Sequence, residues 1–486
     1  MLKNISIQLR KLCPIKKGEF LKFFLTSFFI FCALMIQNIV RMTKDALINT
    51  LVGTEIVVFL KSFIVLPLSI IFTVLYLKIL DIIRAETIFL IVVSIFSVFF
   101  ILFGLIIFPN YELLHLNNES QQFLINKFPH FKWFILLFSN WSFSLFYLFA
   151  ELWPNIILAL LVWQLINTIS TVAESKKFYP LFGLISHTSL IFSGSFFSKI
   201  RNFIPEGANL NLFFLKAISY IIFFFGILLI IMFKILSHKF LQKKTLNFTI
   251  KKMEKFSFKG IFKTLKHQKY IRYITLVLIC YGLSINLVEA PWKSYLSEIF
   301  TTPLDFGENY GKYMQLTGAI TAVMVILSYI VIKNFGWHIA ALLTPITMLT
   351  SGIVFFTSYV LNKHNIFLNI SCLALQSSNF IIIAGAIQNI STKTVKYTFF
   401  DTTKEMSYVP LPYHIKTKGK AVADVTGTKI GKSLSSFLQS IIFIIFPNST
   451  YATTSPFLMI LFILVIITWI IILTKLNREY KILIEK

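Results

Sequence analysis

Apolar stretches of about 20 residues or more recur along the chain, and this recurrence constrains the fold more than any other feature. About 20 consecutive apolar residues are needed for an α-helix to cross the hydrocarbon core of a bilayer. The composition agrees, because 56% of the 486 residues are hydrophobic and only 14% are charged, an apolar share above that of ordinary soluble domains. The sequence therefore predicts an all-α integral membrane protein.

Hydropathy and loop breaks predict about twelve transmembrane helices, six in each half of the chain. The expected spans are 20–48, 55–78, 86–108, 141–171, 178–200, 211–237, 270–296, 310–333, 338–361, 366–396, 424–447 and 455–476. Two similar six-helix bundles around a site at the bilayer midplane are typical of alternating-access carriers of the major-facilitator type. We expect bundles at residues 1–237 and 270–486, joined by a basic cytoplasmic linker at 238–269.

The formal charge of +26 lies mostly between the apolar segments. In a soluble protein it would suggest a nucleic-acid partner, but here ten lysines and one acid, Glu254, fall between Lys239 and Lys269. Basic segments next to membrane helices stay in the cytoplasm. The acidic loops 109–131 and 297–311 are then external. The pattern predicts a multi-pass protein of the cell inner membrane, in contact with the lipid bilayer and not with nucleic acid, with both termini cytoplasmic.

Two familiar kinds of site are not expected. The cysteines Cys13, Cys32, Cys280 and Cys372 lie singly, with no CxxC pair and no suitable histidine spacing, so we expect no disulfide, metal or other cofactor. The segment from Gly427 to Ser433 resembles a phosphate loop, but three residues separate its glycines where four are needed, and no strand precedes it. These departures exclude an ATPase of the P-loop type.

Charged residues inside the predicted spans are few and clustered. Arg41 and Lys44 lie at i, i+3 near the end of the first span and face the same way, as an anion site requires. Glu151 lies within apolar sequence in the fourth span, and Glu289 and Lys293 are spaced at i, i+4 in the seventh. Because a charge at the bilayer centre costs about 2.5–3.5 kcal/mol, such residues indicate a substrate path or an ion pair. A purely structural ion pair stays open for Glu151, Glu289 and Lys293.

Further candidate substrate-binding residues are less strongly constrained. Lys404 and Lys420 lie in a polar stretch between the tenth and eleventh spans, where a solvated loop is the alternative. Asp424 and Lys432 enter an apolar span, where solvation is harder to obtain. Asn167 carries an amide on an apolar helix and therefore needs a hydrogen-bonding partner, which a purine could supply.

Several motifs spread over nearly the whole chain match those of one known family. They include Lys44-Asp45-Ala46-Leu47, Ala150-Glu151-Leu152-Trp153, Glu174-Ser175-Lys176-Lys177-Phe178-Tyr179, Asn286-Leu287-Val288-Glu289 and Phe400-Asp401-Thr402-Thr403-Lys404. In these motifs the chain resembles the nucleotide transporters of obligate intracellular bacteria and plastids, the ATP/ADP translocases. The resemblance implies a twelve-helix carrier that exchanges host ATP for bacterial ADP. It also implies important charges at Lys44, Glu151, Glu289 and Lys420.

The sequence leaves more than one function open. We expect an exchanger of external ATP for internal ADP, and not an enzyme. The first alternative is a proton-coupled importer of several nucleotides or of NAD, in which Glu151 or Glu289 would titrate. An alternative from another class is a membrane-embedded enzyme that processes phospholipids, although no nucleophile and base lie at a workable spacing. In the exchanger, we expect the polyphosphate to be neutralised by Lys44, Lys293, Lys420 and Lys432, and the empty site to be held by Glu151 and Glu289.

Overall fold

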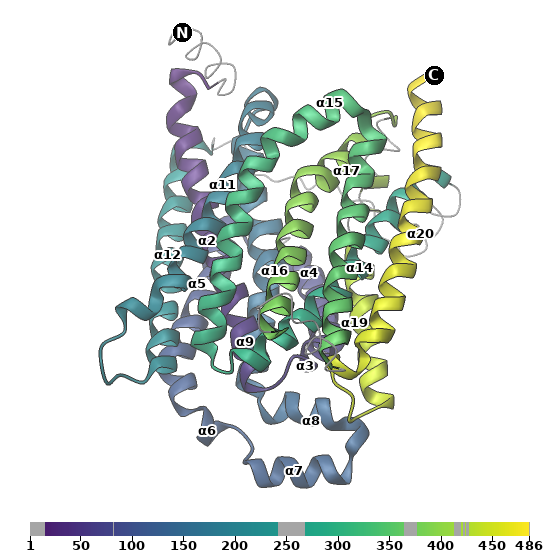
Figure 1. Cartoon of the computed structure of the whole chain (residues 1–486). Helices are drawn as coiled ribbons and strands as arrows, with labels where there is room; N and C mark the ends of the chain where they lie inside the picture. The colour runs from purple at the N-terminus through teal and green to yellow at the C-terminus, as the bar shows by residue number, and fades with distance from the viewer. Residues whose placement is uncertain are drawn as a thin grey trace.

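The computed structural model describes residues 15–80, 82–241, 268–363, 377–412, 419–420, 423 and 427–485. Within these ranges the chain is helical and contains no strand (Figure 1). Eight helices in the described ranges are long and apolar enough to cross a membrane, and two shorter apolar helices accompany them. The predicted all-α membrane fold is therefore confirmed.

The N-terminal half, residues 15–241, supplies helices for each of the first six predicted spans. Its segments, in order, are α2 (Lys17–Leu51), α3 (Ile56–Phe59), η1 (Leu60–Val65), α4 (Leu66–Leu80), α5 (Ala85–Leu102), η2 (Phe103–Ile107), α9 (Trp141–Trp153), η5 (Pro154–Val162), α10 (Trp163–Ile169), α11 (Val172–Lys199), η6 (Ile200–Phe203) and α12 (Leu210–Phe240). A short helical excursion projects beyond the bundle at the bottom of Figure 1. It consists of η3 (Phe108–Asn110), α6 (Tyr111–Leu114), α7 (Asn118–Lys127), η4 (Pro129–Phe131) and α8 (Lys132–Ser139).

The C-terminal half, residues 268–485, contains one long element in which two helices meet at a kink. Its segments are α14 (Lys269–Ile299), α15 (Pro303–Lys363), α16 (Ser377–Val395), η9 (Lys396–Phe400), α17 (Asp401–Ser407), α19 (Thr428–Ile445) and α20 (Tyr451–Glu485). The long α15 bends at Gly336, whose φ of 78° interrupts the helix. Glycine adopts this left-handed conformation without a steric penalty. The two arms of α15 correspond to the predicted spans 310–333 and 338–361.

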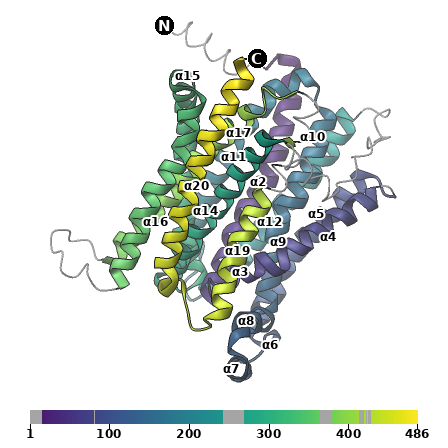
Figure 2. The ribbon, with the colours of Figure 1, turned by 90° about the vertical axis from the view of Figure 1, so that its right-hand side faces the viewer.

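Two parts of the predicted organisation lie largely outside the described residues. Most of the expected linker 238–269 falls in residues 242–267, and the start of the expected span 366–396 falls before Ser377. The exact domain boundaries therefore stay a prediction. Figures 1 and 2 agree that α2 begins and α20 ends on one side of the molecule, opposite α6, α7 and α8.

The outer faces of the helices are apolar. In α20, Ile460, Leu464, Ile467 and Ile471 are all at least 45% exposed and recur every three or four residues, so they form one continuous stripe on the helix. A stripe of this kind in water would be an aggregation hazard. It suits a helix that faces lipid, which is consistent with the place of α20 at the outside of the bundle in Figure 2.

Segments of π-helix interrupt the described α-helices at η1, η2, η5 and η9. Two of them lie close to charged residues inside the bundle, since Lys61 belongs to η1 and Glu151 precedes η5 by three residues. Pro154 opens η5, and proline cannot donate the backbone hydrogen bond that an α-helix would need there. Single π turns inside α-helices occur frequently at functional sites.

The two halves pack closely where α11 crosses α15. A Cβ atom built on Gly194 would lie 2.6 Å from the backbone nitrogen of Gln315, and one built on Gly311 would lie 2.5 Å from Cβ of Phe197. Small residues permit such close approach of helix backbones in membranes. The crossing therefore depends on glycine at both positions.

We expect Gly194→Leu to destabilise the protein, because its side chain would be forced against the α15 backbone. Overpacking of this kind costs about 1–3 kcal/mol. The thermal midpoint of the detergent-solubilised protein should fall. Gly183→Leu, on the same helix, is the matched control, because no atom lies within 4 Å of a Cβ built there. Equal midpoints for the two variants would contradict the packing argument.

Candidate functional site

Eight charged side chains from both halves converge inside the bundle and form what we call the central cluster. Five are cations and three are carboxylates. Its members are Arg41, Lys44 and Asp45 of α2, Lys61 of η1, Glu151 of α9, Glu289 and Lys293 of α14, and Lys393 of α16.

Within the N-terminal half, Lys44 joins two carboxylates. Its Nζ lies 2.9 Å from Oδ1 of Asp45 and 3.0 Å from Oε1 of Glu151. The ammonium also lies 4.1 Å from the centre of the Tyr147 ring, where the negative face of the aromatic ring attracts a cation. The side chain of Lys44 is 6% exposed, so these groups replace the water that an exposed lysine would have.

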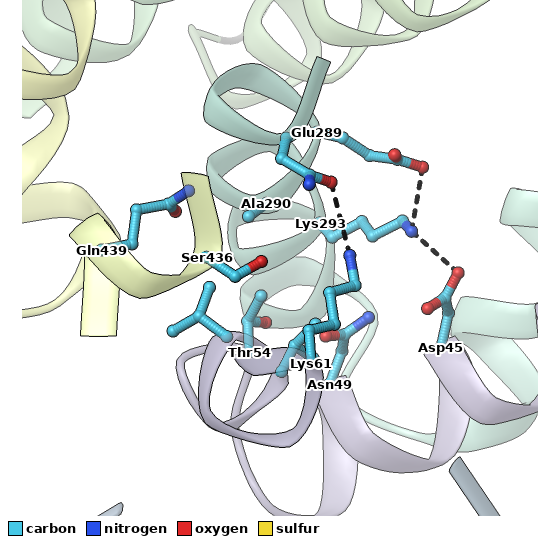
Figure 3. A pocket seen from close by; sticks show the side chains of 12 residues that line it. Asp45, Asn49, Thr54, Lys61, Glu289, Ala290, Lys293, Ser436 and Gln439 are labelled. Carbon is cyan, nitrogen blue, oxygen red and sulfur yellow. Dashed lines mark hydrogen bonds and ion pairs between the residues drawn. The ribbon is translucent and has the colours of Figure 1, made fainter. Parts of the chain in front are cut away.

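A second lysine connects the two halves (Figure 3). Nζ of Lys293 lies 2.8 Å from Oδ2 of Asp45 and 3.0 Å from Oε1 of Glu289. The i, i+4 pair expected from the sequence therefore forms. Glu289 in turn lies 3.4 Å from Nζ of Lys393. Asp45 thus binds Lys44 of its own half and Lys293 of the other half, one with each oxygen.

The cluster has two more cations than carboxylates, and two of the cations lack a carboxylate partner within the described part of the chain. Nζ of Lys61 donates to Oδ1 of Asn286 at 3.4 Å, and the only polar contact of Arg41 there is with the sulfur of Met314, at 3.4 Å. An excess of buried cations is costly unless an anion compensates it. The cluster is therefore suited to bind a multiply charged anion.

A small cavity adjoins the cluster on one side. It has a volume of about 20 Å³, and its lining includes Asp45, Asn49, Lys61, Glu289 and Lys293. This space holds roughly one water molecule, whereas pockets for small-molecule ligands usually have 300–1,000 Å³. A larger anion can reach this side of the cluster only after the helices around it move.

Contacts between the halves close the end of the bundle near α6, α7 and α8. Arg201, in η6 directly after α11, forms ion pairs with Asp305 and Glu308 at the start of α15. The backbone N–H of Tyr451 donates to Oε1 of Glu55 at 3.3 Å. These contacts join the N-terminal and C-terminal halves directly, so this end of the bundle is sealed.

The opposite end, where α2 begins and α20 ends, has a different pattern. Among the described residues, every ion pair there lies within one half. Lys22 pairs with Glu174 and Lys177 with Glu19 in the N-terminal half, and Lys269 pairs with Glu479 in the C-terminal half. The halves are thus locked together by charge at the centre and at one end, but not at the end that carries the termini.

Comparison with known proteins identifies the family. The model of the TLC ATP/ADP transporter family matches residues 3–480. The chain belongs to this family.

Known relatives align with the transporter over nearly its whole length. ADP,ATP carrier protein 4 of Rickettsia bellii is 44% identical over 478 residues, which span 96% of this chain and 92% of the relative. ADP,ATP carrier protein 3 of the same organism is 38% identical over 488 residues, which span 96% of each chain. The alternative of a phospholipid-processing enzyme is not supported, because the family consists of transporters.

Solved structures support the expected fold. A bacterial homologue of the iron transporter ferroportin in its inward-facing state has a TM-score of 0.56 at 12% identity, over 92% of this chain and 98% of that one. The inward-open xylose transporter XylE from E. coli has a TM-score of 0.54 at 11% identity, over 93% and 95% of the two chains. The transporter therefore has the major-facilitator arrangement predicted from its sequence.

The structure places the predicted site residues in more than one location. Arg41, Lys44, Glu151, Glu289 and Lys293 all belong to the central cluster. Their role in substrate binding stays a prediction, but their convergence from three helices gives it a geometric basis.

Lys404 and Lys420 lie apart from the cluster, on either side of Glu405. Nζ of Lys420 lies 2.5 Å and Nζ of Lys404 3.1 Å from a carboxylate oxygen of Glu405. Burial raises the pKa of Glu405, but the hydrogen bond from Lys420 and the charge of Lys404 outweigh burial and hold this pKa below its ordinary value. This group follows η9 in α17, on the side of the molecule where the termini lie.

The remaining predicted residues have different surroundings. Oδ1 of Asn167 accepts a hydrogen bond from Tyr179 at 2.5 Å, which supplies the partner that its amide needs. It lies sixteen residues after Glu151 in the same helical segment, about 24 Å along an α-helix. Lys432 is exposed on α19, and its charge lies close enough to Glu151 to act on it. Asp424 lies outside the described residues.

Sequence reasoning missed two cations of the cluster as site residues. Lys61 is a lysine inside the second predicted span, so hydropathy carried a usable signal for it. Lys393 stands near the end of the tenth span, where a lysine at the membrane interface is an equally good interpretation. Only the three-dimensional contact with Glu289 distinguishes the two interpretations of Lys393.

We expect Lys44→Glu to abolish nucleotide uptake while the protein remains in the membrane. The substitution would place a third carboxylate beside Asp45 and Glu151 and remove a cation from the cluster. Lys44→Arg is the matched control, because it keeps the charge and should retain part of the activity. Uptake of labelled ATP, normalised to the amount of membrane-inserted protein, tests this expectation, and normal uptake by Lys44→Glu would refute it.

Proposed function

We propose that the transporter exchanges ATP for ADP across the membrane by alternating access. The observation that carries this proposal is the family match over residues 3–480 in a chain whose two halves meet at an excess of cations. Curated relatives that cover nearly the whole chain are named ADP,ATP carrier proteins. The phosphates of ATP and ADP carry several negative charges, which suits a cluster that has more cations than carboxylates.

The pair between Asp45 and Lys293 explains why transport would take the form of an exchange. In the empty carrier this pair holds the two halves together. Separating a buried ion pair leaves two charges without a partner inside the bundle, which is costly, so the empty carrier rarely changes sides. A bound phosphate can replace the carboxylates as partner of the lysines. A nucleotide then lowers the barrier for the movement by binding the intermediate arrangement more tightly.

The orientation in the membrane is part of this proposal. The basic segments next to the helix ends favour a cytoplasmic location for both termini, and the start of α2 and the end of α20 lie on the same side of the molecule. The end sealed by Arg201 is then external, and the arrangement described here faces inward. In the cell inner membrane, such a carrier would take up external, host ATP and release internal ADP.

Labelled nucleotide uptake by intact bacteria that express the chain, and that have no such carrier of their own, tests the proposal. The cells are loaded with labelled ATP and then exposed to unlabelled ADP, ATP, GTP or NAD. We expect external ADP and ATP to release the label, because each entering nucleotide drives one out, and GTP and NAD to have little effect. Cells with the empty vector provide the background.

Two results would contradict the exchanger. Uptake that needs no counter-substrate and collapses with an uncoupler would instead establish a proton-driven importer. No uptake of any nucleotide, with the protein present in the membrane, would remove the proposed substrate altogether.

A further inference from the structure

The small cavity beside the central cluster contains polar groups that the exchange mechanism described so far does not use. Both the Nδ2 and the Oδ1 atoms of Asn49 are buried without a hydrogen-bond partner in the described structure, and so is Oε1 of Gln439. Asn49 is 4% and Gln439 is 1% exposed. Both side chains line the cavity.

Unpaired amides at one buried place call for an explanation, because burying a polar group without a partner is unfavourable. Asn49 comes from α2 and Gln439 from α19, so the two belong to different halves. Two elements thus direct unpaired polar atoms into the same space. This arrangement indicates a site whose ligand is a hydrogen-bonding group.

The charge of the cavity indicates which kind of ligand it takes. Lys61 lines it and has no carboxylate partner among the described residues, only the amide oxygen of Asn286 at 3.4 Å. Lys293, by contrast, is held by Asp45 and Glu289. The ammonium of Lys61 and the unpaired Nδ2 of Asn49 are donors that suit a phosphate group. Nε2 of Gln439 already donates to Ser435, and its unpaired Oε1 is an acceptor, which suits a hydroxyl of the same ligand.

The position of the cavity indicates from which side the ligand comes. Asn49 lies two residues before the end of α2, Lys293 six before the end of α14, and Gln439 six before the end of α19. All three helices end on the side of α6, α7 and α8. The cavity is therefore displaced from the cluster toward the end that the proposed topology places outside.

We propose that Lys61 and Asn49 form an outer phosphate subsite, which binds a phosphate of a nucleoside di- or triphosphate arriving from outside, with Oε1 of Gln439 beside it as an acceptor for a hydroxyl of the ligand. The inference rests on the proposed function, and it adds that nucleotide binding differs between the two sides of the membrane. When the external end opens, an arriving nucleotide meets this subsite before it reaches Lys44. When that end closes, as here, the subsite shrinks to the volume of about one water molecule. A nucleotide arriving from the cytoplasm binds without it.

The test compares the KM for external and internal nucleotide in one variant. In Lys61→Met we expect the KM for external ATP, measured in intact cells, to rise about tenfold, the effect of losing one charge-assisted hydrogen bond. The KM for ATP presented to the cytoplasmic face, measured in inside-out vesicles, should stay within about twofold of wild type. Lys61→Arg should restore the external KM.

A matched control lies at the other end of the same helical segment. Lys78 of α4 is exposed and does not belong to the cluster or the cavity, so Lys78→Met should leave both constants unchanged. Asn49→Asp provides a second test if Lys61→Met fails to reach the membrane. The aspartate keeps the shape of the side chain, and its negative charge compensates the positive charge of Lys61. The KM for external ATP should therefore rise, while the KM for ATP presented to the cytoplasmic face should not.

The outcomes separate this inference from the proposed function. Equal changes of the two constants, or no change, in Lys61→Met or in Asn49→Asp would overturn the outer subsite while the exchange of ATP and ADP stands. A wild-type protein that exchanges no nucleotide would overturn the proposed function itself, and the subsite with it. Inhibition of external uptake by inorganic phosphate that Lys61→Met weakens would support a phosphate subsite.

Discussion

The ion pair between Asp45 and Lys293 is the interaction on which the rest of this structure depends. Both groups lie inside the helix bundle of a membrane protein, where water cannot solvate a separated charge at low cost. Asp45 is 2% exposed and divides its two oxygens between lysines of the two halves. The halves are therefore held together by a bond that only another charged group can replace, and this requirement connects the architecture to an anionic substrate.

The other contacts between the halves are distributed unevenly between the two ends of the bundle. Arg201 and Glu55 join the halves at one end, and the described ion pairs at the other end stay within a half. A rocking movement about the central cluster would have to break the first group and form new contacts in place of the second. The glycine contact of α11 with α15 lies near the sealed end, because Gly194 is five residues before the end of α11 and Gly311 is eight after the start of α15.

The sequence predicts the membrane spans well because lipid imposes one simple requirement on every helix, and hydropathy measures it directly. It predicts less well where neighbours decide the structure. The π turn that contains Lys61 depends on packing that no linear pattern records, whereas the break at Gly336 falls between the two predicted spans 310–333 and 338–361. The same holds for the site. Isolated charges such as Glu151 stand out in an apolar span, whereas Lys393 resembles an interfacial lysine until Glu289 is found beside it.

The π-helical segments affect where related chains can differ in length within a membrane helix. Deleting one residue from an α-helix rotates everything beyond it by about 100°, so lengths inside packed membrane helices are normally fixed. At η1, η5 and η9 the chain already contains a wider turn than an α-helix needs. A single-residue deletion there would convert the turn to α-helix and leave the packing beyond it in register. Differences in length within a span should therefore be tolerated at these turns and resisted elsewhere.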